Sequence, residues 1–105
     1  MKRVIIESPL KGDYKTNREY ALECMRDSLR RGEAPFASHL LYAQEGILDD
    51  TIPEERAQGI QAGLAWAEKA DLTALYIDLG ISDGMQLGIQ HAIECKRKIE
   101  VRKIR

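Results

Sequence analysis

The sequence contains two cysteines among its 105 residues, Cys24 and Cys95. Neither belongs to a C-x-x-C pair, and neither has a histidine at a spacing typical of zinc sites, so the sequence predicts no metal site. Both cysteines fall on the expected inner faces of helices. Two buried thiols are typical of a reducing compartment, so we expect a cytoplasmic protein.

The sequence also lacks an excess of charge. Sixteen basic residues oppose seventeen acidic ones, and the net charge is -1. A generic nucleic-acid binder has a basic excess, so we expect no such partner. The local run Lys96–Lys98 and the basic residues near the end are interpreted either as solvated ends of elements or as a phosphate-binding patch.

Long hydrophobic runs are absent, so the sequence predicts no membrane-spanning segment. The apolar residues that follow Lys2 and Arg3 are too few for a signal peptide. Repeats, linkers and low-complexity tracts are absent as well, which indicates a single domain over residues 1–105. A domain of this size buries only about two-thirds of its unfolded surface. We therefore expect a homo-oligomer.

Short, continuously apolar segments, typical of strands, alternate along the chain with longer segments in which apolar residues recur at helical spacing. The expected strands are Val4–Ile6, Phe36–Tyr42, Leu72–Asp78 and Glu100–Ile104. The continuous β-branched run Val4–Ile6 is typical of a strand buried on both faces in a parallel sheet. With right-handed crossovers, the order βαβαβαβ predicts a small doubly wound, flavodoxin- or Rossmann-like α/β fold. We expect a parallel four-stranded sheet in the order 2-1-3-4, with helices on both faces.

Two helix starts carry a capping-box spacing, Thr16 with Glu19 and Thr51 with Glu54. A third helix is expected to begin at Ser82 or Asp83, and whether these two residues serve only as caps is left open.

Two glycines lie one turn apart in the second expected helix, Gly59 and Gly63. A glycine inside a helix is less favourable than alanine by about 1 kcal/mol. The pair therefore predicts a close contact, either with the sheet or with a partner helix. Trp66 lies off the main apolar stripe of this helix and is interpreted as a core edge or a subunit contact.

Ligands of such folds bind at the carboxyl ends of the strands, where the strand order reverses. Three expected loops meet there, residues 7–13, 43–50 and 78–85. G-x-G-x-x-G and P-loop sequences are absent. Acids and hydroxyls in these loops favour a sugar, or a nucleotide whose charge meets the start of a helix. His39 is either a ligand contact or a structural histidine, and neither it nor His91 has an evident serine partner for a Ser-His-Asp triad.

Two short motifs resemble those of nucleoside 2-deoxyribosyltransferase-like proteins. Ser8–Gly12 (S-P-L-K-G) is similar to their G-P-x-x-G opening. Asp83–Gly88 (D-G-M-Q-L-G) is similar to the G-M-E-L-G element that opens a helix, in which the glutamate is the nucleophile. Asn17 and Tyr20 fit the start of the first helix in related short proteins of phages and prophages.

The resemblance places Gln86 at the nucleophile position. An amide cannot form the glycosyl-enzyme ester, although it can hydrogen-bond a ribose hydroxyl. The resemblance also implies a site that a neighbouring subunit often completes. The expected ligand-binding residues are Glu7, Ser8, Pro9, Gly12, Asp13, His39, Asp78, Ser82, Asp83, Gly84, Met85 and Gln86.

Three functions are consistent with these features. The first is binding, without cleavage and without a cofactor, of a nucleoside, a nucleotide or a nucleotide-derived signal. In a phage protein this would sequester a host signal in the host cytoplasm. The second is an N-glycosidase or deoxyribosyltransferase that uses Asp78 or Asp83 with water. The third is a structural role, with Trp66 and the glycine-bearing helices at a partner interface.

Overall fold

Four parallel strands form the central sheet of the computed structural model, which describes residues 1–105. The strands are β1 (Arg3–Glu7), β2 (Ala34–Phe36), β3 (Leu72–Tyr76) and β4 (Lys98–Arg102). Their spatial order is β2-β1-β3-β4, and every neighbouring pair is parallel. The predicted doubly wound α/β fold with strand order 2-1-3-4 is therefore confirmed.

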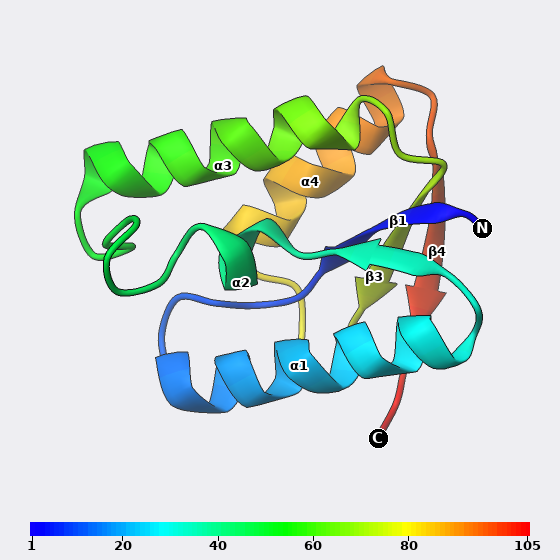
Figure 1. Cartoon of the computed structure of the whole chain (residues 1–105), viewed down its shortest axis with the longest axis horizontal. Helices are drawn as coiled ribbons and strands as arrows, with labels where there is room; N and C mark the ends of the chain where they lie inside the picture. The colour runs from blue at the N-terminus through cyan, green and yellow to red at the C-terminus, as the bar shows by residue number, and fades with distance from the viewer.

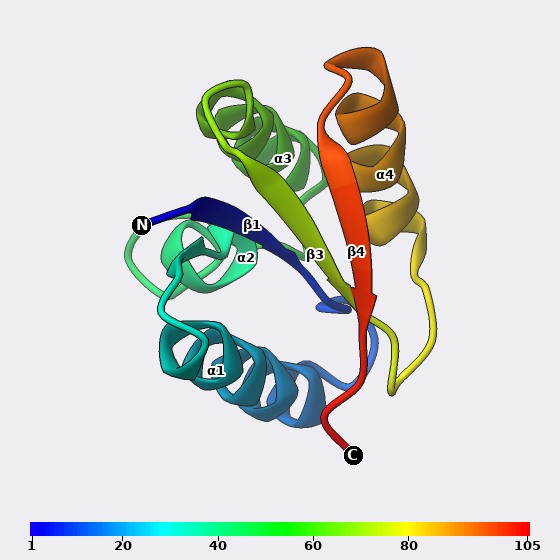
Figure 2. The ribbon, with the colours of Figure 1, turned by 90° about the vertical axis from the view of Figure 1, so that its right-hand side faces the viewer.

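Helices cover both faces of the sheet. They are α1 (Tyr14–Arg30), α2 (Ser38–Leu41), α3 (Pro53–Ala67) and α4 (Asp83–Glu94). Helix α1 lies along one face, while α3 and α4 lie on the other (Figures 1 and 2). None of these helices combines the length and the apolar character that a membrane crossing requires.

The two faces of β1 differ in what covers them. Val4 and Ile6 belong to the main core cluster, which also contains Tyr20 and Cys24 of α1. Because side chains alternate along a strand, Ile5 and Glu7 point to the opposite face, toward α3 and α4. The α1 face is thus the packed core of the protein, and the other face holds a cavity.

Two of the predicted strands are too long. The segment expected as a strand from Phe36 to Tyr42 leaves the sheet after Phe36 and forms the single helical turn α2. Leu40 packs against the core from that turn, whereas Leu41 is exposed. A short apolar run fits a strand or a helical turn equally well, so the sequence pattern did not reveal where the strand ends. Strand β3 ends at Tyr76, and the side chain of Asp78 beyond it accepts hydrogen bonds from the backbone N–H groups of Ile104 and Arg105.

Both predicted capping boxes are wrong. Helix α1 begins earlier than expected, because Asp13 caps it and accepts hydrogen bonds from the backbone N–H (3.1 Å) and the hydroxyl (2.9 Å) of Thr16. Helix α3 has no side-chain cap, since the hydroxyl of Thr51 donates to Asp49 at 2.6 Å. In both places a nearby aspartate accepts a hydrogen bond from the threonine hydroxyl that the sequence pattern assigned to the helix cap.

The edge strand β4 lies two residues earlier in the chain than the predicted strand Glu100–Ile104. Val101 is exposed, whereas Arg102 is only 4% exposed. The Arg102 guanidinium donates to both carboxylate oxygens of Glu33, at 2.8 and 2.7 Å, and to the Tyr76 hydroxyl at 3.1 Å. A buried arginine is tolerated there because its charge is paired. Cys24 is buried as predicted, but Cys95 is exposed.

The paired glycines do make a close contact, but it is made with α2 and the loop that follows it, and not with the sheet or a partner helix as predicted. A Cβ atom on Gly63 would lie 2.6 Å from the Cβ of Ser38 in α2, and one on Gly59 would lie 3.3 Å from Leu48 Cδ1. The glycines therefore let α3 approach α2 and the loop that follows it.

We expect Gly63→Ala to lower the free energy of unfolding by ~1–3 kcal/mol, because the new methyl group overlaps α2. Gly59→Ala is the matched control. It gains a similar helix propensity and meets only the end of a leucine side chain, so its effect should be neutral or stabilising. Denaturant titrations of both variants measure the difference. Equal effects of the two substitutions would contradict the assigned contact.

Candidate functional site

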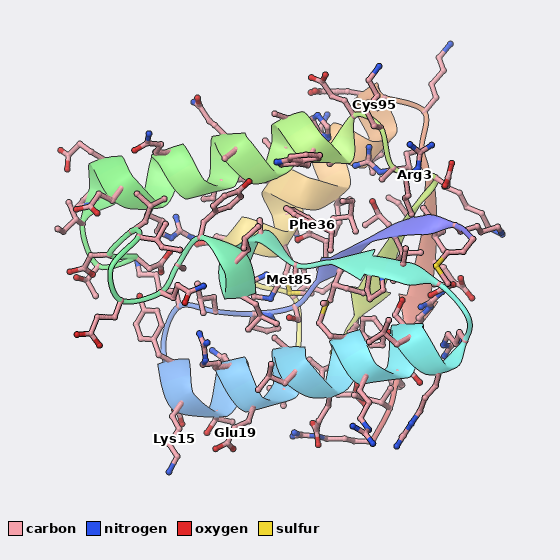
Figure 3. The ribbon with its side chains drawn as sticks, in the orientation of Figure 1. Arg3, Lys15, Glu19, Phe36, Met85 and Cys95 are labelled. Carbon is pink, nitrogen blue, oxygen red and sulfur yellow. The ribbon has the colours of Figure 1, made fainter.

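A cavity of about 470 Å³ lies between β1, α2, α3 and α4, and we call it the β1 cavity. Its volume falls in the range of small-molecule sites, roughly 300–1,000 Å³. Its apolar lining includes Phe36 and Met85, which are both labelled in Figure 3. Further apolar side chains on the lining are Leu10, Leu48, Ile60, Leu64 and Ile81. The cavity thus offers an apolar surface suited to a flat ring.

The cavity exists because α3 does not pack closely on the sheet along its whole length. Ala57, Ile60, Leu64 and Ala67 recur at helical spacing along α3. Ile60, Leu64 and the buried Ala67 all line the cavity, while Ala57 is exposed. At Gly63, α3 approaches α2 closely, so α2 lies beside α3 at this wall of the cavity.

Glu7 lies at the end of β1 and lines this cavity. Its carboxylate packs directly on Gly88 of α4, where any Cβ atom would overlap it. Burial raises the pKa of Glu7 to about 8, and the nearby positive charge of Arg97 offsets this only in part. The side chain of Glu7 is therefore a neutral carboxylic acid at pH 7.

Arg97 is fixed below the cavity by three partners. Its Nε donates to Thr73 Oγ1 at 2.8 Å and its Nη1 to the carbonyl oxygen of Ala67 at 2.7 Å. Its Nη2 lies 3.3 Å from His91 Nδ1. The basic run 96–98 is thus split, because Arg97 is buried while Lys96 and Lys98 are exposed.

Ser8 and His39 form a buried polar pair beside Glu7. Ser8 Oγ and His39 Nε2 share a hydrogen bond of 2.8 Å, so His39 does have the serine partner that the sequence did not reveal. Burial lowers the pKa of His39 to about 4, although the charge of Asp50 acts in the opposite direction. The imidazole is therefore neutral at pH 7. Asp50 binds the Tyr14 hydroxyl at 2.9 Å, so the three residues do not form a hydrogen-bonded triad.

The structure brings most of the predicted ligand-binding residues together. Eight of them line the β1 cavity: Glu7, Ser8, Gly12, His39, Ser82, Asp83, Gly84 and Met85. Ser82 also caps α4 by accepting a hydrogen bond from the Met85 N–H at 3.2 Å, so its capping role is confirmed. Four of the predicted residues do not line the cavity: Pro9, Asp13, Asp78 and Gln86. Gln86 is exposed on α4.

Asp78 is engaged on the α1 side of the molecule. Its carboxylate accepts hydrogen bonds from the Tyr20 hydroxyl (2.5 Å), the Ile104 N–H (3.0 Å) and the Arg105 N–H (2.9 Å). These hydrogen bonds hold the pKa of Asp78 below its usual range, in spite of burial. Asp78 therefore anchors the segment after β4 and has no contact with the cavity.

Several lining residues were not predicted. Arg56 of α3 lies over Gly84 at the start of α4, and its Nε is 3.9 Å from Asp50 Oδ2. Phe36 and Tyr42 also line the cavity, and Trp66 packs on the outer side of Phe36 with 6.1 Å between the ring centroids. Trp66 itself is 62% exposed. In the sequence of this helix, the paired glycines and the off-stripe position of Trp66 were the features that indicated an unusual surface.

No cluster of three or more His, Cys, Asp or Glu side chains in the structure could hold a metal ion. The polar groups of the cavity are instead suited to hydrogen bonding and to proton transfer.

Two cavity groups give opposite pH dependences of stability. Between pH 4.5 and about 8, folded Glu7 holds a proton that the unfolded chain has released, so the free energy of unfolding falls as the pH rises. Between pH 4 and 6.5 the unfolded chain protonates His39 more than the folded chain does, so stability rises with pH. The two effects oppose each other below pH 6.5, and only the effect of Glu7 remains above it.

We therefore expect the free energy of unfolding to fall by about 2 kcal/mol from pH 6.5 to 8.5, and Glu7→Gln to abolish this fall. His39→Gln should keep the fall and lose the opposing rise at lower pH. Denaturant titrations across this pH range measure both. A wild-type slope that persists in Glu7→Gln would show that another group titrates.

The profile of a protein family described as Domain of unknown function (DUF7768) matches residues 2–102, and the chain therefore belongs to this family. No curated protein sequence matches the chain. Seven chains of solved structures match its fold. One of them is the Clostridium botulinum CMP N-glycosidase BcmB, which is 14% identical with a TM-score of 0.59. The match covers 97% of this chain and 71% of that one.

Proposed function

We propose that this member of the DUF7768 family binds a nucleoside or nucleotide in the β1 cavity. The observation that carries the proposal is the position of this cavity, at the carboxyl end of β1 and against the loops that follow β1 and β3, two neighbouring strands whose connections run in opposite directions. Doubly wound folds bind their ligands at this point. The fold that the chain shares with a CMP N-glycosidase supports the same class of ligand.

The chemistry of the lining supports a base and a sugar as the buried parts of the ligand. Apolar side chains form much of the wall, and the polar groups Glu7, Ser8 and His39 are uncharged at pH 7. Of the charged groups, Lys11 lies where the cavity is exposed and Arg56 is half-buried, whereas Arg97 is buried beside Glu7. A phosphate would lie near Arg56 and the N–H groups at the start of α4.

We further propose that the ligand is held without being cleaved. The support is chemical, because the position equivalent to the transferase nucleophile is Gln86, an amide, and Gln86 lies outside the cavity. Sequestration of a nucleotide signal, as in a phage protein acting in a host cytoplasm, is the cellular role that fits such a protein. A homo-oligomer remains part of this proposal.

Isothermal titration calorimetry with ribonucleosides and their monophosphates tests the binding. We expect Ser8→Ala to weaken it about tenfold, because the substitution removes a cavity hydroxyl and leaves buried His39 without a partner. Gln86→Ala is the control and should leave affinity unchanged. Chromatography after the titration should return the ligand intact. A failure of every compound to bind would refute the proposal, and an effect of Gln86→Ala would move the site to the outer face of α4.

A second candidate is hydrolysis of an N-glycosidic bond. The observation that favours it is that a neutral acid, Glu7, and a second carboxyl group, Asp83, line the same cavity. Glu7 would give its proton to the base nitrogen as the bond to C1′ breaks. Asp83 would take a proton from the water that attacks C1′.

We expect Asp83→Asn to reduce any release of free base by 10²-fold or more, in keeping with the loss of a general base. Asp78→Asn should leave the rate per folded molecule unchanged, since Asp78 lies on the α1 side. High-performance liquid chromatography detects the base, and circular dichroism confirms that both variants fold. Equal losses in the two variants would refute the assignment of Asp83.

A further inference from the structure

The surface of α3 that points away from the sheet carries almost no charge. Residues 57–67 of this helix include no Asp, Glu, Lys or Arg, although 31% of the whole chain is charged. No other helix or strand lies on this side of α3 (Figures 1 and 2). The exposed members of the stretch, which we call the α3 outer face, are Ala57, Gln58, Gln61, Ala65 and Trp66.

Helix α1 provides a comparison within the same molecule, because it also covers one face of the sheet. Its exposed side chains include Arg18, Glu19, Glu23, Arg26 and Arg30. The outer surface of a solvated helix normally has such residues. Depletion of charge on one of the two helices is instead typical of a surface that another protein covers.

Packing within the chain does not account for the α3 outer face. Gly59 and Gly63 meet α2 and the loop that follows it, and Ile60 and Leu64 line the β1 cavity. The residues between them point to solvent. At the flank of the face Trp66 remains 62% exposed, and tryptophan is among the residues that contribute most to the stability of protein interfaces.

We propose that the α3 outer face binds the same face of a second copy of this chain. The two α3 helices are antiparallel, about a two-fold axis that passes between Gln61 and Ala62. The inference rests on the homo-oligomer that is part of the proposed function, and it assigns the interface. It does not depend on which ligand occupies the cavity.

The order of residues along α3 makes this face complementary to itself, as a two-fold contact requires. With the axis between Gln61 and Ala62, each of these glutamines lies opposite the alanine of the other copy. One turn away, Gln58 lies opposite Ala65 of the other copy. A long side chain therefore meets a short one at each position. Trp66, near the end of its helix, lies beside the first turns of the other α3.

The charges at the two ends of α3 fit the same register. Glu54 in the first turn lies opposite Lys69 of the other copy, which follows the last turn, so one Glu–Lys pair forms at each end. Both side chains are exposed. Neither forms an ion pair within its own chain. Opposite charges thus border an uncharged centre and favour the antiparallel arrangement.

The size of the face sets the strength of the contact. Helix α3 has 15 residues, which corresponds to a length of about 22 Å. A contact between two such helices lies at the low end of the areas of specific interfaces. We therefore expect a dimer that dissociates on dilution.

Sedimentation equilibrium of the full chain over a range of concentrations tests the interface. Ala65→Glu should weaken the dimer at least tenfold, because it places a charge at the uncharged centre of the contact. Leu22→Glu is the matched control, since it adds the same charge at an exposed apolar position of α1, and it should leave the dimer unchanged. Circular dichroism confirms that both variants fold. A wild-type chain that stays monomeric would overturn the inference, as would equal effects of the two substitutions.

An exchange of charges tests the antiparallel register. Glu54→Lys and Lys69→Glu should each weaken the dimer severalfold, because each turns two attractive pairs into repulsive ones. The double variant should restore most of the affinity. An acid at the start of a helix and a base at its end also suit the dipole of that helix. The double variant separates the two roles, because it worsens the charge–dipole interaction but keeps opposite charges between the copies. A double variant weaker than both single variants would overturn the register.

These outcomes are distinguishable from those of the ligand-binding experiments. A monomeric chain that binds nucleotides refutes the interface alone. A dimer that responds to Ala65→Glu but binds no nucleotide supports the interface and refutes the proposed ligand.

Discussion

The alternation of side chains along β1 is the constraint on which the rest of the structure depends. Val4 and Ile6 point into the core beneath α1, and this packing fixes the strand in place. The same geometry sends Ile5 and Glu7 to the opposite face. A β-branched run that ends in a glutamate thus builds a core on one side and places an acid in a cavity on the other.

Two glycines allow close approaches around the cavity. Helix α3 approaches α2 closely at Gly63, and Glu7 occupies the space that a side chain on Gly88 would need. Glycine therefore has two functions here. In α3 it lets two helices meet, and in α4 it makes room for a carboxyl group.

The sheet could be predicted from the sequence because its strands are short, apolar and separated by clear helical periodicity. The order of strands followed from handedness and the number of crossovers. The boundaries near Ala37 and Thr16 could not be predicted with the same success. One helical turn and one competing aspartate are enough to move an element boundary, and neither leaves a periodic signal. The burial of Arg102 could not be predicted either, because its partner Glu33 is far away in the sequence.

The candidate site shows a similar division. Glu7, Ser8 and the start of α4 could be placed together, since loops at the carboxyl ends of neighbouring strands converge. Asp78 also follows the carboxyl end of a strand, but its hydrogen bonds to the backbone after β4 hold it on the α1 side of the sheet. The partnership of Ser8 with His39 and the position of Arg56 depend on where α2 and α3 pack. Such contacts are set by tertiary structure, and a single sequence contains no local trace of them.

The stacking of Trp66 on Phe36 has a practical consequence. Phe36 lines the cavity on its inner side and meets the indole of Trp66 on its outer side. The chain contains no other tryptophan. Its intrinsic fluorescence therefore originates one aromatic ring away from the cavity, at a position that solvent also reaches. A ligand that displaces the ring of Phe36 would therefore be detected through the emission of Trp66, without a label.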